Sequence, residues 1–485
     1  MVSRFSLLPI AAAFALLWSA MHVCPVAWSA PPEKIALTEL RIIPVGGDED
    51  EIANGTILIE HGKITAIGAK VEIPYDAVVV ELPGKIAFPG MIDPHSARGL
   101  DVANESLPVT PFVDVYDALD PARLFFEDSL RDGITSVHTI PGDNCVIGGL
   151  SRLVRPIGMT PDTMTVKTAV ALKLCTSPRR GSDRMLQMQS LRGTFAELED
   201  YLERVAEERY EESVKRDGKT LDVGPAEARK RGRELVREEH LDDAHRNLAR
   251  LKQGRLDAWI YAGAAMDVGP AIELARSQGF LEHTVLVLGG DAFRAIDELK
   301  AAQRPVVLAA DLVFRDRDRA TGEITEIFVP KLFYEAGLRF ALQPHPDGSL
   351  AERYLTYQAA RCVREGIPRR VALKAITLNP AKMLGCGDRF GSLEVGKTAN
   401  VVIFSGDPLE FSSWVEHVYI DGILAYDRAR DPRIQKLLPK PKDPARAAEP
   451  IDAPTPAPPV GDETPKPSGD GKGGGMRAES AGGNR

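Results

Sequence analysis

A change of hydrophobic pattern along the chain constrains the fold most. Between residues 89 and 390, short apolar runs alternate with helical stretches; the runs include GITSVHTI, DAWIYAGA, TVLVLGG, PVVLAAD and LRFALQ. Strands that alternate with helices favour parallel pairing, because each helical crossover returns the chain to the same edge of a sheet. The span therefore predicts an α/β fold, either a (β/α)8 barrel or a doubly wound sheet. Its length suits a barrel of about 250 to 300 residues.

Both flanks of this span have the pattern of short strands with turns. Residues 31–88 contain ALTELRIIPVG, GTILIEHGKITAIG and DAVVVELPGKIAF, and His61-Gly62 has the composition of a hairpin turn. Residues 391–430 return to the same pattern with GSLEVGKTANVVIFSGDP and VEHVYIDGILAYD. We expect the two ends of the chain to combine into one small composite β-sandwich beside the barrel.

An insertion interrupts the alternation at about residues 195–255. It carries apolar residues at helical spacing among many Glu and Arg residues, which is typical of solvated helices. The segment Asp217–Gly224 is expected to divide it into two helices.

The two termini differ in composition from the rest. Residues 1–30 combine Arg4, an apolar stretch and small residues near Ala30, which is typical of a signal peptide and predicts a secreted or periplasmic protein. The alternative is a retained membrane anchor, since the stretch could nearly span a bilayer. Residues 431–485 are rich in Pro and Gly and predict a disordered tail.

Charge and cysteine content exclude several classes of protein. The chain has 60 Lys and Arg against 69 Asp and Glu, a formal charge of -9, so we expect no nucleic-acid partner and, after signal cleavage, no membrane partner. Five cysteines without a CxxC pair exclude a disulfide-built scaffold and a zinc finger. Cys145, Cys175, Cys362 and Cys386 would remain in an oxidising compartment, and the sequence leaves their pairing open.

Four motifs, in chain order, resemble the amidohydrolase superfamily, with the nearest similarity to its secreted imidazolonepropionase-like branch. The last of them, of the form GSLExGKxAxxV, is the most specific. The motifs are FPGMIDPHS (88–96), GITSVHTIPGDNCVIGG (133–149), ALKAITLNPAKMLG (372–385) and GSLEVGKTANVVIFSGDPLE (391–410). The resemblance implies a distorted TIM barrel flanked by the composite β-sandwich, with a hydrolytic site at the carboxyl ends of the strands.

The resemblance also implies a divalent metal, normally Zn, which activates water and is held by several His and carboxylate ligands. Most positions that match the family's ligands carry other residues here. The first strand keeps His95 of a His-x-His pair, whereas its partner is replaced. The replaced positions are Ala97, Ala171 (for the fourth-strand lysine), Tyr261 and Gly263 (for a second His-x-His pair) and Gly289 (for the sixth-strand His). Lys173 lies two residues after Ala171, on the same strand face. The small residues predict a roomier pocket.

The remaining candidates each have two interpretations. His95 is the predicted metal ligand, or else a hydrogen-bonded pocket histidine. His345 and Asp347 are the candidate catalytic residues, or else loop and turn residues. The predicted pocket residues are His138, Cys145, Lys173 and Tyr261; His138 could equally be packed in the core, and Cys145 has no identifiable base to make it a nucleophile.

Two functional hypotheses follow. The family resemblance implies a hydrolase of non-peptide C–N bonds, such as those of cyclic amides, with a small-molecule substrate. The replaced ligands favour a catalytically inactive pseudoenzyme that binds a ligand or protein in the periplasm or envelope. The sequence leaves the oligomeric state open, a homo-oligomer included.

Overall fold

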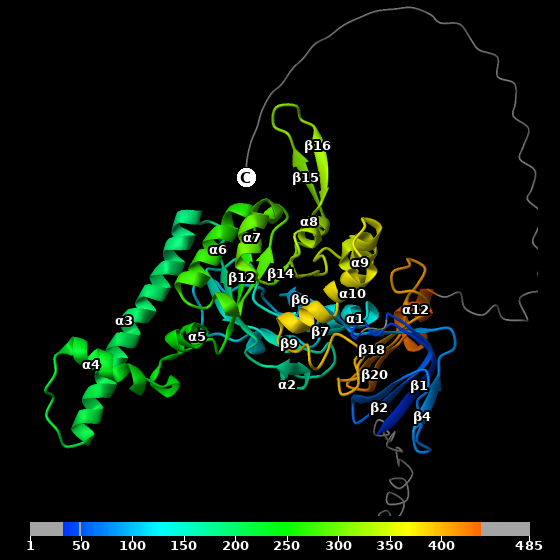
Figure 1. The fold of residues 1–485 in the computed structure, drawn as a ribbon, viewed down its shortest axis with the longest axis horizontal. Coiled ribbons are helices and arrows are strands. Elements are labelled where there is room, and N and C mark those ends of the chain that lie inside the picture. The colour runs from blue at the N-terminus through cyan, green and yellow to red at the C-terminus, as the bar shows by residue number, and fades with distance from the viewer. Residues whose placement is uncertain (1–32, 48–49, 438–485) are drawn as a thin grey trace, which may run out of the picture. The chain divides into compact units, whose positions relative to one another are not determined.

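A computed structural model describes residues 33–47 and 50–437 and shows a mixed α/β fold (Figure 1). The predicted signal peptide and most of the predicted tail lie outside the described residues. The fold continues past the expected boundary at residue 430, because α12 (Pro432–Leu437) follows it and Asp431 is buried. No helix in the described part of the chain combines the length and apolar character that crossing a membrane requires.

The two ends of the chain share one eight-stranded sheet, whereas a composite β-sandwich was expected. Its order is β20-β19-β18-β5-β1-β2-β3, with β4 paired to β1. Antiparallel pairing of β18 with β5, in which Val402 faces Phe88, joins the two ends. The bounds are β1 (Lys34–Ile42), β2 (Ile52–Glu60), β3 (Lys63–Gly68), β4 (Val78–Glu81), β5 (Ile86–Pro89), β18 (Val401–Phe404), β19 (Val415–Ile420) and β20 (Ile423–Asp427).

The central strands form two sheets with the orders β10-β9-β7-β6 and β17-β14-β13-β12-β11-β8. Pairing is parallel between β6 and β7 and between each pair of neighbours from β11 to β17, as the alternating pattern predicts. The bounds are β6 (Met91–Ser96), β7 (Ile134–Thr139), β8 (Ile147–Leu150), β9 (Arg152–Val154), β10 (Thr165–Lys167), β11 (Ala171–Cys175), β12 (Asp257–Ala262), β13 (Thr284–Leu288), β14 (Val306–Val307) and β17 (Phe340–Ala341).

The two sheets adjoin through short connections. The chain runs almost directly from β8, which pairs with β11, into β9, which pairs with β7. At the other side, the backbone N–H groups of Ile92 and Leu342 donate to the carbonyls of Ile376 and Ala375. The parallel strands therefore keep one common direction across both sheets.

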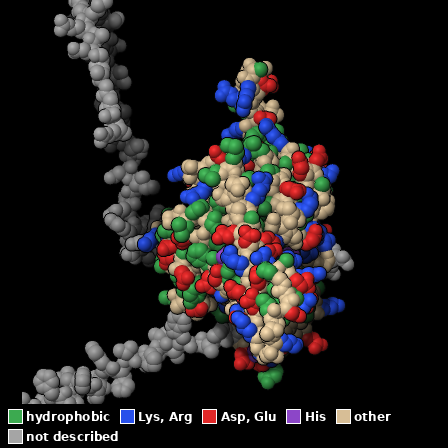
Figure 2. Space-filling model, turned by 90° about the vertical axis from the view of Figure 1, so that its left-hand side faces the viewer, with side chains coloured by type: hydrophobic (Ala, Val, Ile, Leu, Met, Phe, Trp, Pro, Cys, Tyr) green, Lys and Arg blue, Asp and Glu red, His purple; other side chains and the backbone are tan. Residues whose placement is uncertain are grey.

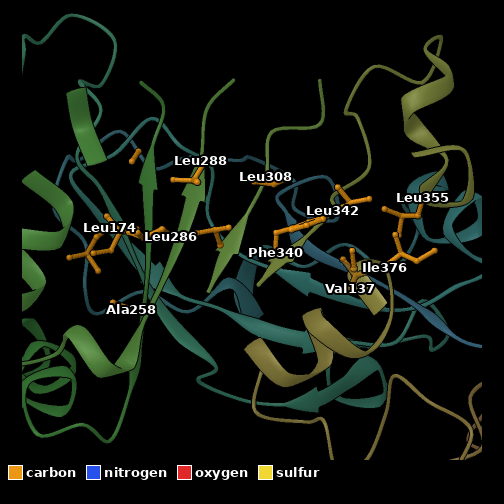
Figure 3. Packing of buried hydrophobic residues seen from close by; sticks show 14 of the residues in the cluster. Val137, Leu174, Ala258, Leu286, Leu288, Leu308, Phe340, Leu342, Leu355 and Ile376 are labelled. Atoms are coloured by element: carbon orange, nitrogen blue, oxygen red, sulfur yellow. The ribbon is translucent and has the colours of Figure 1, made fainter. Parts of the chain in front are cut away.

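Helices cover these strands and bury their apolar side chains. Leu174, Leu286 and Phe340 from three strands lie in one hydrophobic cluster with Leu355 and Ile376 from the helical layer (Figure 3). The helices are α1 (Leu124–Arg131), α2 (Pro161–Met164), α6 (Ala265–Ser277), α7 (Ile296–Ala302), α8 (Val329–Glu335), α9 (Leu355–Arg364), α10 (Arg369–Ala375) and α11 (Leu378–Met383). The hairpin of β15 (Val313–Arg317) and β16 (Ile324–Phe328) projects from this layer (Figure 1).

The insertion consists of α3 (Arg184–Arg216), α4 (Pro225–Gly232) and α5 (Asp243–Lys252). The predicted break at 217–224 is confirmed, because α3 ends at Arg216 and α4 starts at Pro225. Figure 2 views the molecule from this side, where acidic and basic side chains are interspersed. Ion pairs such as Arg229 with Glu203 and Glu207 account for much of the charge. The expected solvated helical face is therefore present.

Candidate functional site

Three polar side chains meet at the carboxyl ends of the central strands, and we call them the Lys173 cluster. Lys173 lies on β11, His95 near the end of β6, and Asp143 in the loop that follows β7. The Lys173 Nζ atom lies 2.9 Å from Nε2 of His95 and forms an ion pair with the Asp143 carboxylate. His95 Nε2 is also 3.4 Å from Asp143 Oδ1. Three separate segments thus contribute to one cationic centre.

A second contact fixes the His95 ring. Its Nδ1 atom lies 3.2 Å from Oε1 of Gln343, and the Gln343 amide donates to the Leu308 carbonyl at 2.9 Å. When Nδ1 donates to the Gln343 oxygen, Nε2 is left to accept a hydrogen bond from the Lys173 ammonium. The imidazole is therefore held from both sides by protein groups.

The charges of the cluster stabilise one another. Burial of Lys173, whose side chain has 0% exposure, disfavours its ammonium form, but the Asp143 carboxylate outweighs this and raises the pKa of Lys173. Burial likewise acts to raise the pKa of Asp143, whereas Lys173 and His95 lower it well below its usual range. The pair is therefore ionised, with the Asp143 side chain still 36% exposed to solvent.

The lysine that contacts His95 comes from position 173 and not from position 171. Ala171 is buried with Ile92 and Trp259 in a separate apolar cluster. The alignment that put Ala171 in place of the fourth-strand lysine is therefore corrected by two residues. Both positions lie on the same strand face, so periodicity alone could not separate them.

Gly263 and Gly289 do not enlarge the site, in contrast to the expectation of a roomier pocket. A Cβ atom added to Gly289 would lie 1.9 Å from the carbonyl oxygen of Gly263, closer than any non-bonded contact allows. A Cβ on Gly263 would lie 2.7 Å from the Tyr261 hydroxyl and 2.9 Å from Ser177 Oγ. The Gly263 backbone fills the space that a side chain at position 289 would need, and the Tyr261 and Ser177 side chains fill the space at position 263.

A hydrogen-bonded network holds this closed arrangement. The hydroxyl of Ser177 accepts from the Gly263 N–H and donates to Asp267 Oδ2 at 2.7 Å. Asp267 is buried and also accepts from Arg184 at 2.7 Å. The Tyr261 ring lies 5.5 Å from Lys173 Nζ, and burial raises the pKa of Tyr261 to about 12. Sequence analysis found neither Ser177 nor Asp267, which carry no motif.

His138 lies inside the core. Its Nδ1 and Nε2 atoms are each 2.7 Å from a partner, the Pro94 carbonyl and the Ser151 hydroxyl. Burial lowers the pKa of His138 to about 3, so the ring is uncharged at neutral pH. These contacts fit the interpretation of His138 as a packed residue. Ala97, the other half of the first-strand pair, has no donor atom to offer.

His345 and Asp347 lie apart from the cluster in the loop after β17. The Asp347 carboxylate accepts from the N–H and hydroxyl of Ser349, as turn residues do, and its own N–H donates to His345 Nδ1. The other polar neighbour of His345 is Asp311, at 3.5 Å. The structure does not bring these two residues to the Lys173 cluster, where Asp143 and Gln343 lie instead.

The cluster does not fit a zinc ion. Within residues 33–47 and 50–437, no group of three or more His, Cys, Asp or Glu side chains is placed to hold a metal. Catalytic zinc normally has three protein ligands. His95 and Asp143 are two donors, and the Lys173 ammonium already occupies the space between them.

Comparisons with known proteins give a consistent family assignment. A model described as "Amidohydrolase family" matches residues 351–426. The chain is 26% identical to the amidohydrolase tasK of Hapsidospora irregularis over 84% of its own length but only 45% of that protein. It is 31% identical to the N-substituted formamide deformylase of Arthrobacter pascens over 22% of each chain. The chain thus spans under half the length of these curated relatives.

One solved structure is similar over its whole length. It is an amidohydrolase from Thermotoga maritima MSB8, 27% identical, with a TM-score of 0.67, and the match covers 81% of this chain and 100% of that one.

Proposed function

Because the chain belongs to the amidohydrolase superfamily, we propose that it is a metal-independent member that binds a ligand at the strand ends without hydrolysing it. We infer that the two central sheets correspond to the distorted (β/α)8 barrel of the family. In this proposal, the Lys173 ammonium lies at the strand ends of the barrel in place of a metal ion.

The observation that carries the proposal is the position of the Lys173 ammonium. It places a single fixed positive charge in contact with both His95 and Asp143, the two side chains that could otherwise donate to a metal. An ammonium has no vacant coordination position and cannot lower the pKa of bound water toward neutrality as zinc does. The cluster can hydrogen-bond a ligand through the partly exposed Asp143 carboxylate but lacks a generator of hydroxide.

The closed backbone at Gly263 and Gly289 supports the same proposal independently. A histidine restored at position 289 would require the two strand ends to separate, because its Cβ alone overlaps the Gly263 carbonyl. The loss of ligands is therefore accompanied by a matching change of backbone packing.

A second candidate function, hydrolysis of a non-peptide C–N bond, is favoured by the names of the relatives. One of them is an N-substituted formamide deformylase and another an amidohydrolase. In this alternative, His95 would be a metal ligand and the substrate would be a formamide or a related amide.

The full chain is purified from cultures grown with and without added zinc or manganese, and its metal content is measured by elemental analysis. The result distinguishes the metal-independent binding function from hydrolysis. We expect far less than one ion per chain, and no hydrolysis of a panel of N-formyl amines and lactams above that of His95→Ala. His283→Ala is the matched control, because His283 pairs with Asp257 away from the cluster. Stoichiometric zinc that is lost in His95→Ala but kept in His283→Ala would refute the metal-independent function.

A further inference from the structure

Two buried thiols lie beside the Lys173 cluster. Cys145 and Cys175 are recorded as free cysteines, and their Sγ atoms lie 3.5 Å apart. Cys145 has 4% and Cys175 0% exposure. Neither thiol is needed by the proposed function, and the other two described cysteines, Cys362 and Cys386, are not paired with them.

The thiols connect the same two segments as the ion pair. Cys145 follows Asp143 by two residues in the loop after β7, and Cys175 follows Lys173 by two residues on β11. The buried Gln187 side chain donates to the carbonyls of both cysteines, at 2.9 and 2.8 Å, and so keeps these segments together. The backbone is therefore already arranged for a bond between the sulfurs.

We propose that Cys145 and Cys175 form a reversible disulfide that ties the Asp143 loop to β11 and holds the Lys173 cluster closed. The oxidant is a low-molecular-weight disulfide. The Cys145 thiolate attacks it and expels one thiolate, which takes up the proton that Cys145 released, and a mixed disulfide remains. The Cys175 sulfur then attacks Cys145 Sγ and expels the second thiolate, which takes up the proton that Cys175 releases. Two protein thiols are oxidised and one external disulfide is reduced to two thiols.

The environment of Cys145 suits the first step. Its contact with Cys175 lowers the pKa of Cys145 against the effect of burial, and the Lys173 ammonium adds to the lowering. Cys145 is itself 4% exposed and lies directly beside the exposed Asn144, so the oxidant reaches it when this surface loop moves. The disulfide would join residues 30 positions apart. A cross-link of that span restricts the unfolded chain and so stabilises the folded state.

The test equilibrates the full chain with oxidised or reduced glutathione, blocks free thiols under denaturing conditions and maps peptides without reduction. We expect a cross-linked peptide that joins Cys145 to Cys175 after oxidation, its disappearance with reduced glutathione, and a higher unfolding temperature for the oxidised form. Cys362→Ser should keep both results, and Cys145→Ser should lose both.

Full alkylation of both cysteines after incubation with oxidised glutathione would overturn the proposal. So would a stable glutathione adduct on Cys145 without the cross-link. Should Cys145→Ser prove poorly folded, Cys175→Ala gives the same test, because alanine fills part of the thiol volume and removes the resolving sulfur. The metal analysis above is unaffected by either result.

Discussion

The strand ends that face the candidate site fall into two halves with different contents. At β6 and β11, polar side chains from the strands contribute to the Lys173 cluster. At the ends of β12 and β13, where Gly263 and Gly289 lie, close contacts with backbone and with the Tyr261 and Ser177 side chains fill the space. We call the ends of β6 and β11 the polar half, because they contribute charged side chains, and the ends of β12 and β13 the closed half, because close contacts fill the space there.

Two roles are thus separated among the strand ends. The charged groups lie at β6 and β11, whereas close packing dominates at the ends of β12 and β13. Parallel ladder pairing from β11 to β17 continues through both halves. The polar half should therefore tolerate substitution better than the closed half, although it contains the groups of chemical interest.

The largest effect is expected for Gly289→Ala in the closed half. Its Cβ would overlap the Gly263 carbonyl, which is backbone and cannot rotate away, so we expect a loss of about 3 kcal/mol of unfolding free energy or more. Gly290→Ala is the matched control, because its Cβ would lie 3.5 Å from the Phe314 ring, an ordinary contact. Urea unfolding of both variants measures the difference; equal stability would show that the closed half is open in solution.

A smaller effect is expected for Lys173→Met in the polar half. The substitution leaves Asp143 without its counter-ion, but solvent reaches about a third of that carboxylate, so we expect a loss of about 2 kcal/mol, less than for a fully buried pair. Because the pKa of Lys173 is raised and that of Asp143 is lowered, the loss should stay constant between about pH 5 and 9.

Two variants check the origin of that loss. The double variant Lys173→Met with Asp143→Asn should recover part of it, since no unpaired charge then remains, and Lys70→Met, at an exposed lysine, should change little. A double variant that is less stable than Lys173→Met would contradict the ion-pair explanation.

The composite sheet and the parallel strands could be predicted because their evidence is local. Alternating apolar residues and turn residues specify β1 to β5 and β18 to β20, and the alternation of strands with helices specifies parallel pairing. That both ends of the chain join one sheet could be predicted because the pattern of short strands and turns returns after residue 390.

The candidate site could be predicted only in part. His95 was identified by motif, and Lys173 by its position two residues after Ala171 on the same strand face, but the contact between them depends on how β6 and β11 approach each other in space. Asp143 and Gln343 come from loops whose course no periodicity specifies. The closure at Gly263 and Gly289 could not be predicted, since a missing side chain can leave a cavity or let two backbones approach.

The smallest effect concerns a reference pair remote from both halves. Asp431 accepts from Arg131 Nε at 2.7 Å and from the Tyr426 hydroxyl at 3.1 Å, and these contacts lower the pKa of Asp431 to about 2. A lowered carboxylate pKa stabilises the folded state above the unfolded value near 4 and loses this effect as the pH falls toward 2. The lowering of this pKa to about 2 sets an upper bound of about 2.5 kcal/mol at pH 7 for the carboxylate. We expect Asp431→Asn to cost less than this bound, about 1 to 2 kcal/mol, because the amide oxygen can still accept hydrogen bonds, and progressively less below pH 4.

Asp388→Asn, at an exposed aspartate, is the control and should show neither the loss nor its pH dependence. Thermal unfolding from pH 7 to pH 3 measures both variants against the unmodified chain. If Asp431→Asn cost as much as Lys173→Met, the Lys173 cluster would be no more than another ion pair at the edge of the fold. A clearly larger loss for Lys173→Met would instead show that the charge left unpaired in the polar half is the costlier one, as expected when its counter-ion is an ammonium with 0% exposure.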